Sequence, residues 1–220
     1  MSKSKDLTDS TAKAVVSTLK SIGIANSFFD GLLKSGDDWT FVIKVHALLE
    51  TALTHLLVSE LERQELTEIF ANIEMSNART GKVAFAKELG LLGVVGRRFV
   101  RKFSELRNDL VHDVRNTSFS FGPIPFSPGS TSSNDLQRTA WSCIDAASEF
   151  FKEKLEFSGR RVSRKDFARQ KPRLAIWFAV YFVLAEIYHQ VAPDDLLVRA
   201  LLKVRRRQPN KAVNSGAPVS

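Results

Sequence analysis

With 220 residues, 44% of them hydrophobic and 25% charged, the chain can bury a sizeable core as one compact domain. The 32 basic and 24 acidic residues give a net charge of +8, which suits a polyanionic partner but does not require one. The single cysteine, Cys143, excludes an internal disulfide, and no apolar signal segment follows residues 1–6, so we expect a cytoplasmic protein.

Residues 1–37 are expected to form a helical extension. Weak helical periodicity covers residues 7–21, and a second short helix is predicted over residues 24–34. A domain of helices should then occupy residues 38–207. Its first strong helix begins near Asp38, and its apolar residues recur at spacings of three and four, which is typical of a core helix. These residues are Phe41, Val45, Leu48, Leu49, Ala52, Leu56 and Leu57.

A histidine and a glutamate lie four residues apart on this helix, beside the apolar stripe. Glu50 either reaches the region around Arg107 and orients a side chain there, or forms an ordinary pair with His46 on a half-buried face. His46, Glu50 and His55 do not have the spacing of a metalloprotease zinc site, and the chain has one cysteine. We therefore expect neither a metal ion nor a cofactor.

A basic stretch follows two further short helices, which are predicted over residues 62–76 and 82–89. Its side chains Arg97, Arg101 and Lys102 either hold RNA phosphates or form a solvated face. The apolar side chains of the same stretch recur at helical spacing, so we predict that they are buried rather than stacked on RNA bases. They are Phe99, Phe103, Leu106 and Leu110.

An Arg-x4-His motif lies near the end of the helix that this stretch begins. It consists of Arg107 and His112, with the polar residue Asn108 directly after the arginine. Metal-independent RNA cleavage needs a base, an acid and positive charge beside the phosphorus, and histidine and arginine can supply them. A spacing of five places Arg107 and His112 about 140° apart around a helix, so the two need a helix end or a second chain to act together.

This motif resembles that of the HEPN superfamily of small helical domains, many of which are RNA-cutting toxins or defence nucleases. The order of the helices sharpens the resemblance. A helix containing residues 46–50, the stretch 82–92 and then the motif are arranged as in the branch that contains the mannitol operon repressor family. The resemblance covers residues 38–190.

The resemblance implies an all-α, HEPN-like bundle of about five core helices that forms a homodimer. The motif would lie at the dimer interface, where two copies of His112 share one cleft. It further implies a metal-independent endoribonuclease that acts on RNA, alone or under the control of an antitoxin or another regulatory protein. The alternative that it leaves open is a non-catalytic regulator, in which the motif only stabilises the dimer.

The C-terminal half is predicted to contain a loop, three helices and a tail. Residues 116–133 are rich in Gly, Pro and Ser and are predicted to be a loop, and a helix should follow from about residue 135 to 157. The apolar run 174–187 is shorter than the roughly 20 residues of a membrane-spanning helix, so we expect a core helix and no membrane association. After a last helix over residues 196–206, the basic C-terminal end is predicted to be disordered over residues 208–220. No helix-turn-helix pattern is apparent, which argues against direct reading of a DNA sequence.

Overall fold

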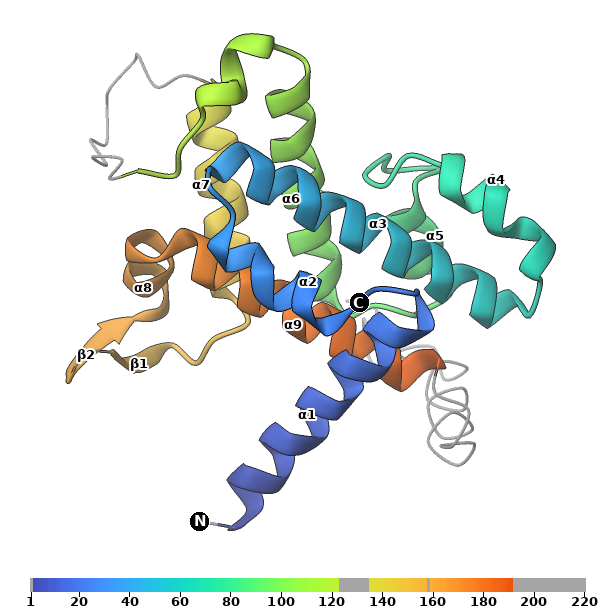
Figure 1. The fold of residues 1–220 in the computed structure, drawn as a ribbon, viewed down its shortest axis with the longest axis horizontal. Helices are drawn as coiled ribbons and strands as arrows, with labels where there is room; N and C mark the ends of the chain where they lie inside the picture. The colour runs from blue at the N-terminus through green and yellow to red at the C-terminus, as the bar shows by residue number, and fades with distance from the viewer. Residues whose placement is uncertain (1, 123–134, 158, 192–220) are drawn as a thin grey trace, which may run out of the picture.

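The computed structural model describes residues 2–122, 135–157 and 159–191 (Figure 1). Within them the chain is built almost wholly from helices, which confirms the predicted all-α class. The one sheet in these ranges is a short antiparallel hairpin. The predicted last helix, residues 196–206, and the predicted disordered tail, residues 208–220, lie outside the described residues.

The elements follow one another along the described ranges as helices, with the hairpin near the C-terminal end. The α-helices are α1 (Ser2–Ser21), α2 (Asn26–Gly31), α3 (Asp38–Leu61), α4 (Thr67–Asn72), α5 (Lys82–Glu88), α6 (Val94–Val111), α7 (Asp135–Ser148), α8 (Arg164–Gln170) and α9 (Pro172–Val191). The 3-10 helices are η1 (Leu32–Lys34), η2 (Gln64–Leu66) and η3 (Val114–Ser118), and the strands are β1 (Lys154–Phe157) and β2 (Arg160–Ser163). Among the described helices, the five longest, α1, α3, α6, α7 and α9, carry most of the buried apolar side chains.

Helices α3 and α9 form the centre of the fold. The predicted apolar stripe of α3 is fully buried, from Phe41 to Leu57, and α9 packs against α1, α3 and α7. By length and composition, both helices are apolar enough to cross a membrane. However, 67% of the apolar segment of α3 and 44% of that of α9 is buried inside the fold, where both helices contribute side chains to the core.

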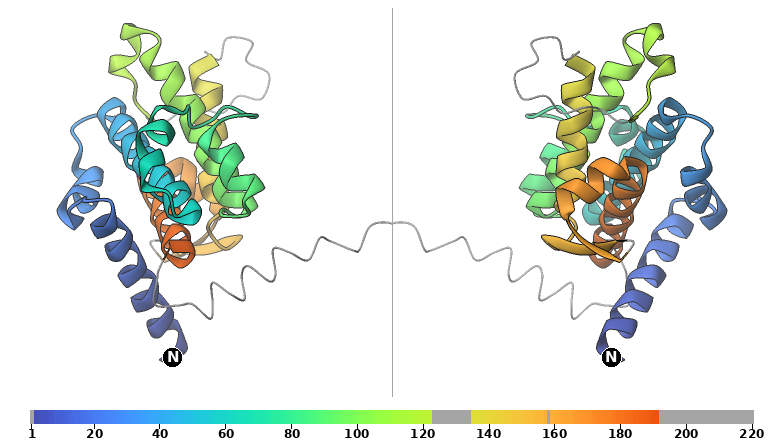
Figure 2. Two further views of the ribbon diagram at one scale, coloured as in Figure 1. Left: turned by 90° about the vertical axis from the view of Figure 1, so that its right-hand side faces the viewer. Right: turned by 90° about the vertical axis from the view of Figure 1, so that its left-hand side faces the viewer.

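Helix α1 lies along α9, and its N-terminal half projects beyond the body of the fold (Figures 1 and 2). The side chains of Ala14, Val15 and Leu19 are buried in the common core. The buried Thr18 hydroxyl lies 2.9 Å from the carbonyl oxygen of Leu184 and donates to it. The predicted N-terminal extension therefore shares its core with the helices that follow.

Helix α6, which carries the motif, is held at its N-terminal end by α9. The backbone N–H of Gly93, the N-cap residue of α6, donates to Glu186 Oε1 at 2.5 Å. A Cβ at Gly96 would lie 2.9 Å from the other carboxylate oxygen, so glycine allows α9 to approach this closely. Burial raises the pKa of Glu186, because the charged carboxylate has lost contact with water. The N–H of Gly93 and the charge of Arg97 act in the opposite direction, but they do not outweigh this loss.

The prediction of one long helix from about residue 135 to 157 is wrong in its second half. Helix α7 ends at Ser148, and β1 pairs with β2 from Lys154–Ser163 to Phe157–Arg160. The side chains of β1 alternate between exposed and half-buried, which is the period of a strand and not of a helix. Gly159, with φ 74°, precedes β2 and supplies the backbone conformation that a tight hairpin connection requires.

The predicted loop over residues 116–133 begins inside η3 and then runs back to α3. Phe121 is buried, and its N–H donates to Asp38 Oδ2 at 2.6 Å. The Ser120 hydroxyl donates to the same oxygen at 2.9 Å. The start of the loop is therefore fixed to the N-terminal end of α3, while residues 123–134 lie outside the described residues.

Candidate functional site

Helix α6 divides into a buried face and a polar face, as its sequence predicts. Phe99, Phe103, Leu106 and Leu110 are at most 1% exposed and face α3 and α7. The two phenylalanines are therefore core residues, and they are not available to stack on bases. Arg107 and Asn108 lie beside this stripe and are half-buried.

His112 caps the C-terminal end of α6, and its side chain is exposed. Its backbone N–H donates to the carbonyl oxygen of Asn108 at 3.1 Å, which closes the last turn of the helix. The imidazole borders a surface pocket of about 720 Å³. Its lining includes the acidic residues Asp109, Asp113 and Asp135, the basic residue Arg115, and polar and apolar side chains.

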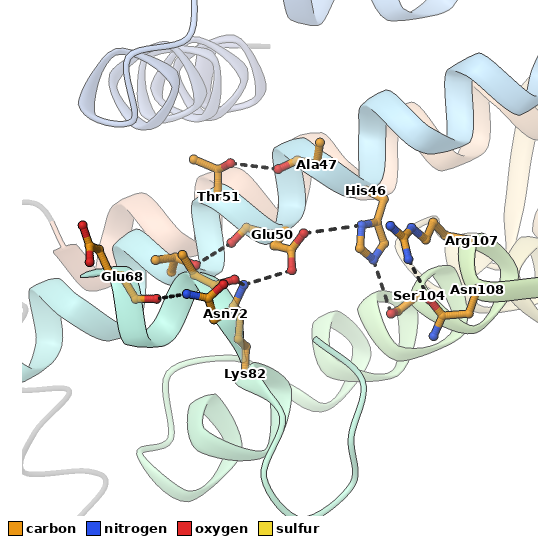
Figure 3. A network of polar contacts seen from close by, with 12 residues as sticks. His46, Ala47, Glu50, Thr51, Glu68, Asn72, Lys82, Ser104, Arg107 and Asn108 are labelled. Carbon is orange, nitrogen blue, oxygen red and sulfur yellow. Dashed lines mark hydrogen bonds and ion pairs between the residues drawn. The ribbon is translucent and has the colours of Figure 1, made fainter. Parts of the chain in front are cut away.

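Arg107 lies beside His46 of α3 (Figure 3). Its Nη1 donates to the side-chain oxygen of Asn108 at 3.2 Å, and its charge acts on His46. Within the described part of the chain, Arg107 forms no ion pair with a carboxylate and no hydrogen bond with His112. One chain therefore brings Arg107 to Asn108 and His46, but it does not bring the two ends of the motif together.

A network of polar side chains connects α6 with α3 and α5 (Figure 3). His46 Nε2 lies 3.4 Å from the buried Ser104 hydroxyl, and its Nδ1 lies 3.9 Å from Glu50 Oε2. The other carboxylate oxygen of Glu50 accepts a hydrogen bond from Lys82 Nζ at 3.1 Å. Glu50 thus reaches His46 and Lys82, and His46 lies between it and Arg107.

Lys82 is the side chain of this network that the sequence did not indicate as a candidate. It is the first residue of α5 and is 0% exposed, and its ammonium group also donates to the carbonyl oxygen of Ala71 at 3.2 Å. Lysines are almost never fully buried unless they are paired. The available signal was its place between Gly81 and the apolar residues Val83 and Ala86, which are buried as well.

His46 is electrically neutral at neutral pH. Burial, together with the positive charge of Arg107, lowers the pKa of His46 from its usual 6.5 to about 4. Glu50 opposes this shift, and Lys82 adds to it. At pH 7 the His46 ring therefore carries no positive charge that would repel the Arg107 guanidinium.

This shift predicts that acid destabilises the fold through His46. Because the pKa is lower in the folded than in the unfolded chain, the contribution of His46 to stability is complete above pH 6.5 and is lost as the pH falls toward 4. A shift of this size corresponds to about 3 kcal/mol. Urea unfolding at several pH values in this window should show that His46→Gln loses less stability on acidification than the wild type.

His55 serves as a reference for that experiment, because burial lowers its pKa as well and it contributes with the same sign. Both proteins retain His55, so only the difference between them reports on His46. Equal acid sensitivity of wild type and His46→Gln would contradict the assignment.

The predicted phosphate-binding residues gather in one groove beside α5 and α6. Arg97, Arg101 and Lys102 line a cavity of about 480 Å³, together with Lys87 and Arg98. Lys102 pairs with Glu105 at 2.6 Å, and Arg98 pairs with Glu149 at 2.8 Å. Arg101 is exposed and has no ion-pair partner in the described chain, so it is the cation of this groove most available to a ligand.

Neither a metal-binding site nor a reactive thiol is found in the described ranges. No three His, Cys, Asp or Glu side chains lie together in a way that could hold a metal ion there. Cys143 is buried in α7, and burial raises the pKa of its thiol, which disfavours the nucleophilic thiolate.

Compared with protein-family models, with curated proteins and with solved structures, the chain matches none of them.

Proposed function

We propose that this protein is a HEPN-like, metal-independent endoribonuclease. The proposal rests on one observation about the C-terminal half of α6. Arg107 is half-buried and has no carboxylate partner in the described chain, and the exposed His112 lies at the end of the helix. The guanidinium of Arg107 has further N–H groups that can donate to phosphate oxygens, and the imidazole of His112 is exposed to solvent and can transfer protons. Asn108 fixes one end of the guanidinium through its side-chain oxygen.

The chemistry is an attack of the RNA 2′-oxygen on the adjacent phosphorus. A base removes the proton of the 2′-hydroxyl, the bond from phosphorus to the 5′-oxygen breaks, and an acid protonates the leaving oxygen. The products are a 2′,3′-cyclic phosphate and a 5′-hydroxyl. Arg107 stabilises the negative charge on the crowded phosphorus, and His112 transfers protons.

A homodimer is part of this proposal, because one chain does not bring Arg107 and His112 into contact. Two copies of α6 that meet at their C-terminal ends would place two exposed His112 side chains in one cleft. One imidazole would then act as the base and the other as the acid.

The basic groove extends the site along α6. Arg101 precedes His112 by eleven residues, so at about 1.5 Å per residue the two lie about 16 Å apart along the helix. An RNA strand that crosses the groove would meet Arg101 through its phosphates, and the buried Phe99 and Phe103 would not read its bases. The proposal therefore includes cleavage with little sequence preference. It also includes action in the cytoplasm, under the control of an antitoxin or regulatory protein.

A non-catalytic regulator, similar to the mannitol operon repressor family, is the second candidate. The observation that favours it is the polar surrounding of each motif residue within one chain. Arg107 contacts Asn108, and three aspartates, Asp109, Asp113 and Asp135, line the pocket beside His112 against one arginine, Arg115, which is paired with Asp113. This acidic surplus disfavours phosphate. In this role the motif would stabilise a protein interface.

Incubation of the purified protein with mixed cellular RNA in excess EDTA tests the proposal. We expect fragments that end in 2′,3′-cyclic phosphate and 5′-hydroxyl groups, from a protein that light scattering shows to be a dimer. Purification under denaturing conditions, followed by refolding, removes any inhibitory partner. Intact RNA after that step, or a strict monomer, would favour the regulator.

A further inference from the structure

Arg107 is a half-buried cation with no anion assigned to it in the described structure. Its one side-chain hydrogen bond goes to the neutral amide of Asn108, and its neighbour on α3 is the neutral ring of His46. A charged group taken partly out of water is costly unless an anion compensates for it. The surroundings of Arg107 therefore suit an anionic ligand that arrives from solution.

The carboxylate that could compensate Arg107 from within is occupied elsewhere. Glu50 lies on the other side of His46, 3.9 Å from the ring, and its side chain is 36% exposed (Figure 3). Its second oxygen is held at 3.1 Å by the ammonium group of Lys82. Within the described chain, Glu50 is the one carboxylate that pairs with Lys82. Because Lys82 has no access to water, its ammonium group needs this partner, and the pair is held in this orientation.

We propose that Lys82 is a positioning residue that holds Glu50 as its own partner and thereby leaves the Arg107 guanidinium to bind a phosphate group. Without Lys82, the Glu50 carboxylate would be drawn to the remaining positive charge across His46. It would then be free to turn toward Arg107 and to compete with a phosphate for the guanidinium. The use of this phosphate site for RNA rests on the proposed function, whereas the charge arrangement can be tested without RNA.

Inorganic phosphate is the probe, and the NMR signal of the Arg107 Nε–H group is the readout, in full-length protein with labelled arginine. Lys82→Met should weaken phosphate binding at this signal about tenfold, because Glu50 becomes a local competitor. The double variant Lys82→Met with Glu50→Gln should return the affinity to within about twofold of the wild type. Lys44→Met, the same substitution at an exposed site of α3, should have no effect.

Arg107→Ala separates this site from the basic groove. It should remove the phosphate-dependent response at the motif, while the signals of the groove arginines still respond. The double variant also decides the matter where Lys82→Met alone fails to fold, since it leaves neither a buried ammonium group nor an unpaired carboxylate in the network. Weak phosphate binding by a folded double variant would overturn the proposal, as would wild-type binding by Lys82→Met.

The same variants keep the two proposals apart. Restored phosphate binding by the double variant, with no RNA cleavage by any protein, would exclude the nuclease and leave the role of Lys82 intact. RNA cleavage by the wild type and equally by a folded Lys82→Met variant would support the nuclease and overturn the role of Lys82.

Discussion

His112→Ala is expected to abolish RNA cleavage in excess EDTA, with a loss of at least about 100-fold in rate, the usual contribution of a positioned acid or base. The side chain is exposed at the end of α6 and makes no hydrogen bond in the described structure. Its removal should therefore change the free energy of unfolding by less than about 0.5 kcal/mol. Cleavage of a labelled RNA and thermal unfolding, measured on the same preparations, give both values.

His189→Ala is the matched control, because His189 is also an exposed histidine near the end of a helix. It should cleave RNA at the wild-type rate. If His112→Ala retains cleavage, the activity arises elsewhere on the protein or from a contaminant. A large fall in melting temperature without any catalytic change would instead give His112 a structural role at the helix end.

Periodicity made the long helices predictable, and the hairpin was missed for a related reason. The stripe of α3 recurs at three and four from Phe41 to Leu57, so its burial was correctly predicted. Strand β1 is only four residues long, with two apolar side chains, and a segment of that length does not distinguish a strand from the end of a helix. Pairing with β2 decided its conformation, and pairing is not a local property of the sequence.

The contacts of the candidate site could not be predicted from the sequence. Spacing on one helix predicts that Arg107 and His112 lie about 140° apart, because it depends only on the helical repeat, and no hydrogen bond joins them in the described structure. The contact between His46 and Ser104 joins residues 58 apart, and the pair of Glu50 and Lys82 joins residues 32 apart. Such contacts depend on how α3, α5 and α6 pack, which the spacing within any one helix does not contain.

The N-terminal end of α3 illustrates the same limit, because two neighbouring aspartates there have different roles. From the sequence alone, both Asp37 and Asp38 are acidic residues at the positive end of a helix, where a carboxylate is favoured. Asp37 does have that role, since its side chain accepts from the Thr40 N–H at 2.6 Å. Asp38 is buried instead, and it joins three separate parts of the chain.

Asp38→Ala is expected to lower the free energy of unfolding by about 4 kcal/mol, the cost of breaking a buried ion pair from one side. Its Oδ1 accepts from Arg173 at the start of α9, and its Oδ2 accepts from Ser120 and Phe121. Removal of the carboxylate would leave the half-buried Arg173 with a backbone partner only, the carbonyl oxygen of Ser35 at 2.7 Å. Urea unfolding of the wild type and the variant measures the difference.

Asp37→Ala is the control for this prediction, since it removes an exposed cap one residue earlier and should cost clearly less stability than Asp38→Ala. The double variant Asp38→Ala with Arg173→Met should recover part of the lost stability, because it removes the uncompensated cation together with the carboxylate. Equal losses for Asp37→Ala and Asp38→Ala would mean that both act only on the helix dipole. The contacts of Asp38 with α9 and with the start of the 116–133 loop would then add nothing measurable to the fold.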